Sequence, residues 1–181
     1  MNPNHSNGRY GPVSIGLHWL MLALLIAVYA CINLTDLYPK GSETREALKA
    51  WHFMLGLTVL VLVVVRLVNR WFSTAPPVVP ALPVWQQRLS GFIHLALYVL
   101  MIAMPVLGWL VLSASAKPIP FFGLQLPSLL AENKALAHDL KEVHETFGTV
   151  GYFLIGLHAL AALFHHYIAR DNTLVRMLPG R

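Results

Sequence analysis

Apolar side chains are concentrated in four long runs of the chain. Each run holds roughly 20 residues, which is the length that an α-helix needs to cross the hydrocarbon core of a bilayer. The runs cover residues 14–34, 51–71, 91–113 and 144–168. We therefore predict an all-α integral membrane protein in which four spans form one bundle, with residues 1–181 as a single domain.

The polar stretches between the runs predict two further features. Residues 73–83 contain four prolines and predict a stiff, extended connection between the second and third spans. Between the third and fourth spans, Ser128 is the predicted N-cap of a short amphipathic helix that ends at Val143. We expect this helix to lie on the outer surface of the membrane.

The overall composition agrees with a membrane protein. Hydrophobic residues make up 56% of the chain and charged residues only 12%, and the mean hydropathy is +0.59. This leaves too little polar surface to cover a water-soluble domain.

The distribution of basic residues predicts that both termini are cytoplasmic. The two tails and the connection between the second and third spans hold a single acid, Asp171, and seven arginines: Arg9, Arg66, Arg70, Arg88, Arg170, Arg176 and Arg181. The other two connections hold six basic residues and the remaining seven acids. Lys117 and Lys134 count less, because they lie in the longest loop, away from the helix ends.

Two histidines of the last apolar run suggest the chemistry. His144 and His158 are fourteen residues apart, which in an α-helix is a rise of about 21 Å with a rotational offset of about 40°. Both imidazoles therefore face one side at two depths, as a protein that holds two haems across a bilayer requires. Depth pairs His52 with His144 on the periplasmic side. It pairs either His18 or His94 with His158 on the cytoplasmic side, and does not choose between them.

Each histidine also has a simpler interpretation. His18 lies beside Trp19 and His52 beside Trp51, so either ring could belong to an interfacial aromatic belt. Four histidines at two matched depths nevertheless favour haem ligation. The single cysteine, Cys31, and the lack of a Cys-x-x-Cys-His motif exclude covalent attachment, so the haems would be b-type.

Other polar residues near the predicted membrane surfaces have two interpretations. His165 and His166 are either part of a hydrated helix end or take part in proton or quinone chemistry. Arg66 either extends to the cytoplasmic interface or forms a salt bridge with a haem propionate. Outside, most basic residues are interleaved with acids and are expected to be solvated, but Lys40, Lys49 and Lys141 could attract a small anion. His5 and His138 are expected to be solvated.

Several motifs in order along the chain resemble those of the bacterial cytochrome b561 family, in particular its superoxide:ubiquinone oxidoreductase members. They are SIGLHW at 14–19, APPVVP at 75–80, MPVLG at 104–108, GYFLIGLH at 151–158, HHY at 165–167 and DNTLVRMLP at 171–179. The outer loops are the part that matches poorly.

The resemblance implies a bacterial inner-membrane bundle with two b haems. It implies His18 with His158 and His52 with His144 as axial ligands, and so selects His18 over His94. His94 would then lie near the haem or the quinone. Electrons would pass from superoxide at the periplasmic face to ubiquinone in the membrane, with His94, His165 and His166 as candidates for proton transfer.

Three classes of function remain open from the sequence. The first is the oxidoreductase just described, with lipid, quinone and superoxide as partners. The second is a dihaem carrier subunit between quinol and a separate redox partner. The third is a non-redox membrane protein whose histidines pack or bind another metal. Nothing in the sequence indicates binding of nucleic acid.

Overall fold

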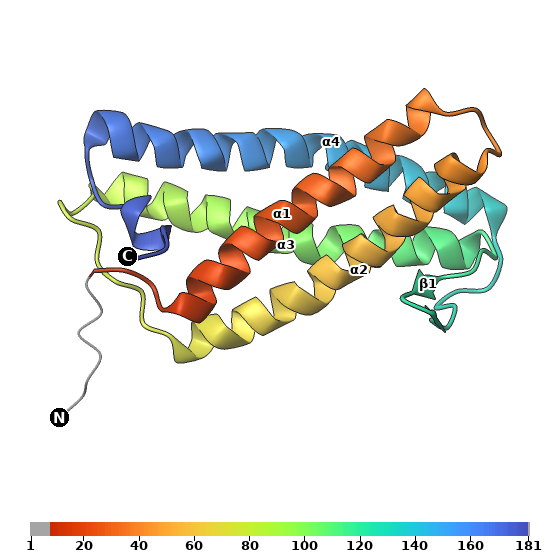
Figure 1. Cartoon of the computed structure of the whole chain (residues 1–181), viewed down its shortest axis with the longest axis horizontal. Coiled ribbons are helices and arrows are strands. Elements are labelled where there is room, and N and C mark those ends of the chain that lie inside the picture. Colours follow the sequence, from red (N-terminus) through yellow and green to blue (C-terminus); the bar gives the residue numbers. More distant parts are fainter. Residues whose placement is uncertain (1–7, 181) are drawn as a thin grey trace.

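The computed structural model describes residues 8–180, and these fold into four long α-helices that lie along one another (Figure 1). The helices are α1 Pro12–Leu34, α2 Glu43–Phe72, α3 Val84–Ala114 and α4 Lys134–Phe164. All four are long and apolar enough to cross a membrane. The predicted all-α membrane bundle is therefore confirmed.

The short elements lie at the two ends of the bundle. A 3-10 turn, Thr35–Leu37, follows α1, and a two-stranded antiparallel hairpin of β1 Pro120–Phe121 and β2 Leu124–Gln125 follows α3. A π-helical turn, His165–Ala169, and a 3-10 turn, Val175–Met177, follow α4. We call the end at which α1 begins and α4 ends the tail end, and the end with the hairpin the loop end (Figure 1).

The prediction of a separate amphipathic helix from Ser128 to Val143 is wrong. Residues 128–133 are not helical, and α4 runs without a break from Lys134 through the predicted start of the fourth span. The Ser128 hydroxyl donates to the carbonyl oxygen of Leu130 at 2.6 Å, so it closes a local turn and cannot cap a helix. Asn133 caps α4 instead, because its side-chain oxygen accepts from the backbone N–H of Leu136.

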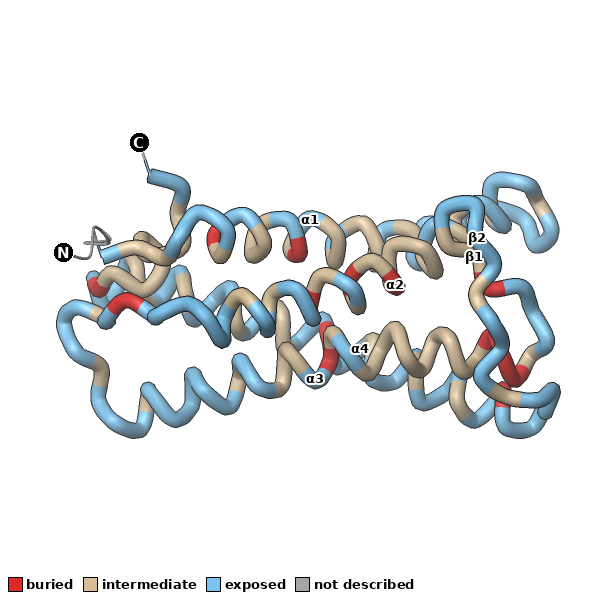
Figure 2. The backbone as a smooth tube through the Cα atoms, turned by 90° about the horizontal axis from the view of Figure 1, so that it is seen from below, coloured by how far each residue is buried: buried red, intermediate tan, exposed pale blue. Residues whose placement is uncertain are grey.

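The helices pack in sequence, with α1 along α2, α2 against α3 and α3 along α4. One buried cluster, Met21, Val59 and Val63, joins α1 to α2 in the middle of the bundle. A second, Leu57, Leu112 and Ile119, lies beneath the hairpin at the loop end. Figure 2 shows that few positions are buried, while most of the tube is half-buried or exposed. The exposed apolar side chains are the surface that lipid would cover.

The proline-rich connection at residues 73–83 is neither helix nor strand, and its end residues Ser73 and Pro83 have extended backbone. The C-terminal tail holds this connection in place. The N–H of Val79 donates to the side-chain oxygen of Asn172 at 2.8 Å, and the N–H of Asn172 donates to the carbonyl of Val79 at 3.1 Å. Arg176 donates to the carbonyl of Pro76. The C-terminal tail thus packs across this end of the bundle and is bonded to the 73–83 connection.

Candidate functional site

The loop end brings together His52 of α2 and His144 of α4. Their ring centroids are 6.2 Å apart, with an interplanar angle of 79°. The Nδ1 atom of His52 lies 3.0 Å from the carbonyl oxygen of Val28 on α1. Because a carbonyl only accepts hydrogen bonds, Nδ1 carries the proton and Nε2 is left free to bind a metal.

His144 fits into a space that a neighbouring glycine provides. A Cβ atom on Gly108 of α3 would lie 3.4 Å from Cε1 of His144, so the absence of a side chain lets α3 approach the ring. The Nδ1 atom of His144 is buried and has no hydrogen-bond partner among the described residues, although it lies near the backbone of Met104. A glycine cradle and a buried polar atom without a partner are features of a ligand site rather than of a closed apolar core.

A second pair, His18 of α1 and His158 of α4, lies nearer the tail end. Their ring centroids are also 6.2 Å apart, with an interplanar angle of 66°. The indole of Trp19, next to His18, donates to the carbonyl of Met177 in the C-terminal tail at 2.7 Å. The tail therefore contacts the helix turn that carries this histidine.

The common separation has a chemical meaning. An imidazole nitrogen binds a first-row metal ion at about 2.0–2.1 Å. When two imidazoles bind one metal ion from opposite sides, the distance between their ring centroids is the sum of the two metal–nitrogen bonds and the two distances from nitrogen to ring centre. This sum is about 6 Å. Both histidine pairs have this spacing. The residues present thus fit an iron held between two imidazoles at each of two depths.

His94 of α3 lies close to the second pair but has a different geometry. Its ring centroid is 5.3 Å from that of His158, which is shorter than the 6.2 Å of both other pairs. Its Nδ1 donates to the carbonyl of Ser90 at 2.7 Å. The rings of His18 and His94 thus both lie near that of His158, and the 6.2 Å separation of the His18 ring suits a metal ion between two imidazoles better than the 5.3 Å separation of the His94 ring.

Arg66 of α2 does not simply extend toward the end of the bundle. Its guanidinium lies 3.2 Å from Nδ1 of His18 on α1 and 3.3 Å from the hydroxyl of Tyr98 on α3. Arginine only donates hydrogen bonds, so Nδ1 of His18 accepts in this arrangement. Arg66 therefore lies among three helices, beside a candidate ligand.

The tail end also contains a histidine–carboxylate pair. Nδ1 of His165 lies 2.5 Å from a carboxylate oxygen of Asp171, and the other oxygen accepts from the N–H of Thr173 at 2.8 Å. Asp171 is only 6% exposed. Burial alone would raise the pKa of Asp171, but the hydrogen bonds from Thr173 and His165 outweigh it and lower the pKa. From the sequence, Asp171 was recognised as a charge and as the first residue of the motif at 171–179, but not as the partner of His165. Its position six residues after a candidate proton-transfer histidine was the available signal.

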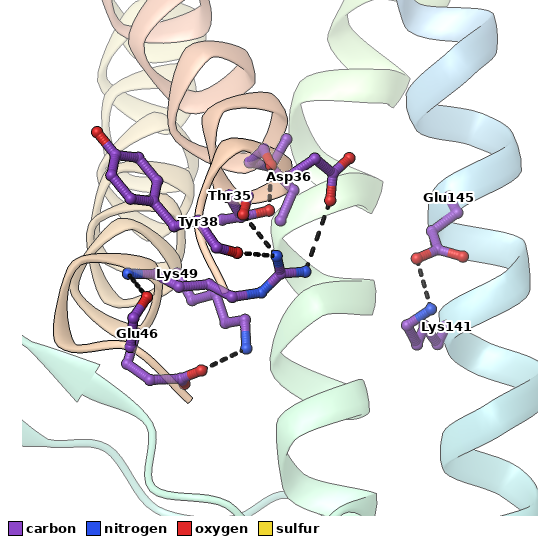
Figure 3. A network of polar contacts seen from close by, with 10 residues as sticks. Thr35, Asp36, Tyr38, Glu46, Lys49, Lys141 and Glu145 are labelled. Atoms are coloured by element: carbon purple, nitrogen blue, oxygen red, sulfur yellow. Dashed lines mark hydrogen bonds and ion pairs between the residues drawn. The ribbon is translucent and has the colours of Figure 1, made fainter. Parts of the chain in front are cut away.

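Most charges at the loop end are balanced by a neighbour. Figure 3 shows Lys49 paired with Glu46 and Lys141 paired with Glu145. The nitrogen–oxygen distances of these two ion pairs are 2.6 and 2.5 Å. Lys40 is exposed and makes no ion pair within residues 8–180. The Arg45 guanidinium donates to the carbonyls of Thr35 and Tyr38 and thus holds the turn between α1 and α2.

The remaining histidines contribute less to the site. His138 is exposed and lies 3.8 Å from the carboxylate of Glu142, as expected for a solvated helix face. The ring of His166 packs against Tyr167, with centroids 4.7 Å apart. His5 lies outside the described residues.

A membrane bundle with histidine pairs at two depths is typical of b-type membrane cytochromes. The model of the family described as prokaryotic cytochrome b561 matches residues 9–180, and the chain belongs to this family. The chain is thus a membrane electron-transfer protein whose family binds haem b, and the resemblance found in the sequence is confirmed.

Several relatives match over nearly their whole length. The protein named cytochrome b561 homolog 1 of Escherichia coli is 38% identical over 96% of this chain and 98% of its own length. A protein of Yersinia pestis named probable superoxide oxidase CybB is 37% identical over 96% and 97%. Cytochrome b561 homolog 2 of Escherichia coli is 30% identical over 94% and 91%.

Proposed function

We propose that this protein is a dihaem b-type cytochrome that transfers electrons across the bacterial inner membrane. His52 and His144 are the axial ligands at the loop end, and His18 and His158 are those nearer the tail end. The observation that carries this proposal is the equal 6.2 Å separation of the two histidine pairs. Following the basic residues of the tails, the loop end is periplasmic and the tail end cytoplasmic.

The chain's own residues prepare both sites. Haem, when bound, would supply one-electron redox chemistry, and ligation by two imidazoles would leave its iron no free coordination position. The Val28 carbonyl holds the ring of His52 with Nε2 free. Ligation by Nε2 of His18 requires the proton on Nδ1, so Arg66 must leave its present contact with Nδ1.

The proposed donor is superoxide and the proposed acceptor is ubiquinone. Two superoxide anions give up one electron each at the periplasmic face and leave as two molecules of oxygen. Ubiquinone takes up the two electrons and two protons to form ubiquinol. The name of the Yersinia pestis relative, probable superoxide oxidase, supports this choice of donor.

The protons for ubiquinone require titratable groups, and the tail end has three candidates: His94, His165 and His166. Of these, His165 is the best oriented, because Asp171 holds its Nδ1 and leaves Nε2 available to exchange a proton. We therefore propose that ubiquinone is reduced at the tail end, close to the ligands His18 and His158.

The second candidate function is that of a carrier between quinol and a protein partner. Its support is the outer surface, where Lys49 and Lys141 are already paired with glutamates and only Lys40 of the three candidate lysines remains unpaired among the described residues. Such a mixed surface attracts a small anion weakly but suits a protein with complementary charges.

A superoxide pulse applied to the purified oxidised protein separates the two functions. The oxidase predicts rapid haem reduction by the pulse to the extent that dithionite achieves. Haem that dithionite reduces and superoxide does not would contradict the oxidase and support the carrier.

A further inference from the structure

A cavity of about 160 Å³ lies at the tail end, beside the second histidine pair. Its lining includes Ser14, Arg66, Asn69, Arg70 and Tyr98, together with Met177 of the C-terminal tail. This volume is well above the roughly 10–15 Å³ that a single water molecule needs. The cavity is thus large enough for small polar groups of a ligand.

The charge of this wall is unbalanced. Neither Arg66 nor Arg70 makes an ion pair with any acid in the part of the chain that the structure describes. Asp171, the acid of this end, is committed to His165 and Thr173. Two guanidinium groups in a partly buried wall, with no acid to balance them, favour an anion with planar, paired oxygens, because a carboxylate accepts two parallel hydrogen bonds from arginine.

Arg66, a residue of the cavity wall, also contacts the candidate ligand His18. Arg66 lies 3.2 Å from Nδ1 of His18, and Ser14 precedes His18 by one helical turn on α1. The side-chain amide of Asn69 donates to the hydroxyl of Ser14 at 2.7 Å, which fixes this part of the wall. When Nε2 of His18 binds iron, Arg66 loses its acceptor at Nδ1 and its guanidinium turns to another partner.

We propose that this cavity receives the propionate carboxylates of the haem held by His18 and His158. Arg66 and Arg70 form the ion pairs, and the hydroxyls of Ser14 and Tyr98 donate further hydrogen bonds. The inference rests on the proposed haem at this pair, and it assigns to Arg70 a role in haem binding. The phosphate of a lipid headgroup has related chemistry and is the other source of an anion.

The experiment uses the purified holoprotein with Arg66→Gln, Arg70→Gln and the double substitution. Arg88→Gln is the matched control, because Arg88 is an exposed arginine of α3 that does not line the cavity. Haem content, the rate of haem loss to an acceptor protein and the midpoint potential of each haem are measured. The haem at His52 and His144 serves as the internal control in every variant.

We expect each cavity variant to lose the haem of the second pair about tenfold faster, the change that one charge-assisted hydrogen bond produces. The midpoint potential of the haem at His18 and His158 falls in these variants, because removing a nearby positive charge favours the oxidised, more positive iron. Arg66→Lys restores much of the potential since it keeps the charge. The haem at His52 and His144, and the control Arg88→Gln, remain unchanged.

Two results would overturn the proposal. If all cavity variants keep both haems at unchanged potentials and loss rates, the cavity does not hold propionates. If they instead lose tightly bound phosphorus while both haems are unaffected, the anion is a lipid phosphate. A wild-type protein without haem at His18 and His158 would refute the proposed function itself. If Arg66→Gln fails to fold, the result for Arg70→Gln tests the proposal. Retention of the haem at His52 and His144 shows that this variant is folded.

Discussion

The carbonyl oxygen of Val28 lies 3.0 Å from Nδ1 of His52, so a backbone group of α1 orients a side chain of α2. The same helix carries His18, ten residues before Val28, and the His18 ring contacts Arg66 of α2. Helix α1 thus supplies a ligand to one proposed haem and orients a ligand of the other. A rigid shift of α1 is expected to disturb both sites together.

Gly108 makes the clearest structural prediction at the loop end. A Cβ atom there would already lie 3.4 Å from Cε1 of His144, so Gly108→Val is expected to displace the imidazole and to lower haem occupancy at His52 and His144. Haem content per chain measures this. Gly91→Val on the same helix is the control, because a Cβ on Gly91 meets nothing within 4 Å. Equal occupancy in the two variants would refute the predicted role of Gly108.

Gly151 predicts a coupled pair of substitutions. A Cβ there would overlap the hydroxyl of Tyr29, which donates to the carbonyl of Gly148 at 2.9 Å and joins α1 to α4. Gly151→Ala is expected to destabilise the protein by about 1–3 kcal/mol through overpacking. In a Tyr29→Phe background the cost of Gly151→Ala falls, since the hydroxyl is gone. Thermal unfolding of the four proteins measures the coupling, and additive costs would contradict it.

Asp171 predicts a dependence of stability on pH. Its pKa is lowered in the folded protein, so the ionised carboxylate contributes stability above the pKa of the unfolded chain. This contribution is lost as the pH falls through the lower, folded pKa. At neutral pH, Asp171→Asn is expected to destabilise the protein by about 1–3 kcal/mol, the cost of weakening buried hydrogen bonds to a charged group.

Unfolding curves of the wild type and Asp171→Asn, recorded from neutral pH down to about pH 2, test this prediction. The difference between the two proteins should be largest at neutral pH and disappear in acid. A difference that stays constant across the range would show that the carboxylate charge contributes nothing.

The membrane spans were predictable because hydrophobic length alone decides whether a helix can cross a bilayer. The proximity of the His52 and His144 rings was predictable from depth, because position along a helix sets depth in the membrane. Depth could not distinguish His18 from His94, because each lies near the start of its helix and both helices start at the same end of the bundle. Only the distances of 6.2 and 5.3 Å to His158, which depend on how α1 and α3 pack around α4, distinguish them.

The features that the sequence analysis missed depend on local competition or on distant contacts. Ser128 was predicted to cap a helix, but its hydroxyl bonds the Leu130 carbonyl, and Asn133 caps α4 instead. Asp171 reaches His165 only because a π-helical turn and a left-handed residue at Arg170 reverse the chain. Such reversals leave no hydrophobic period in the sequence.

We propose that two separate histidine pairs each hold one b haem. The most direct measurement is haem per chain, with the reduced-minus-oxidised spectrum, for the wild type, His144→Leu and His158→Leu. We expect two haems in the wild type and one in each variant, with the two variants losing different spectral components. A wild-type protein with no haem, or variants that each keep both, would contradict it.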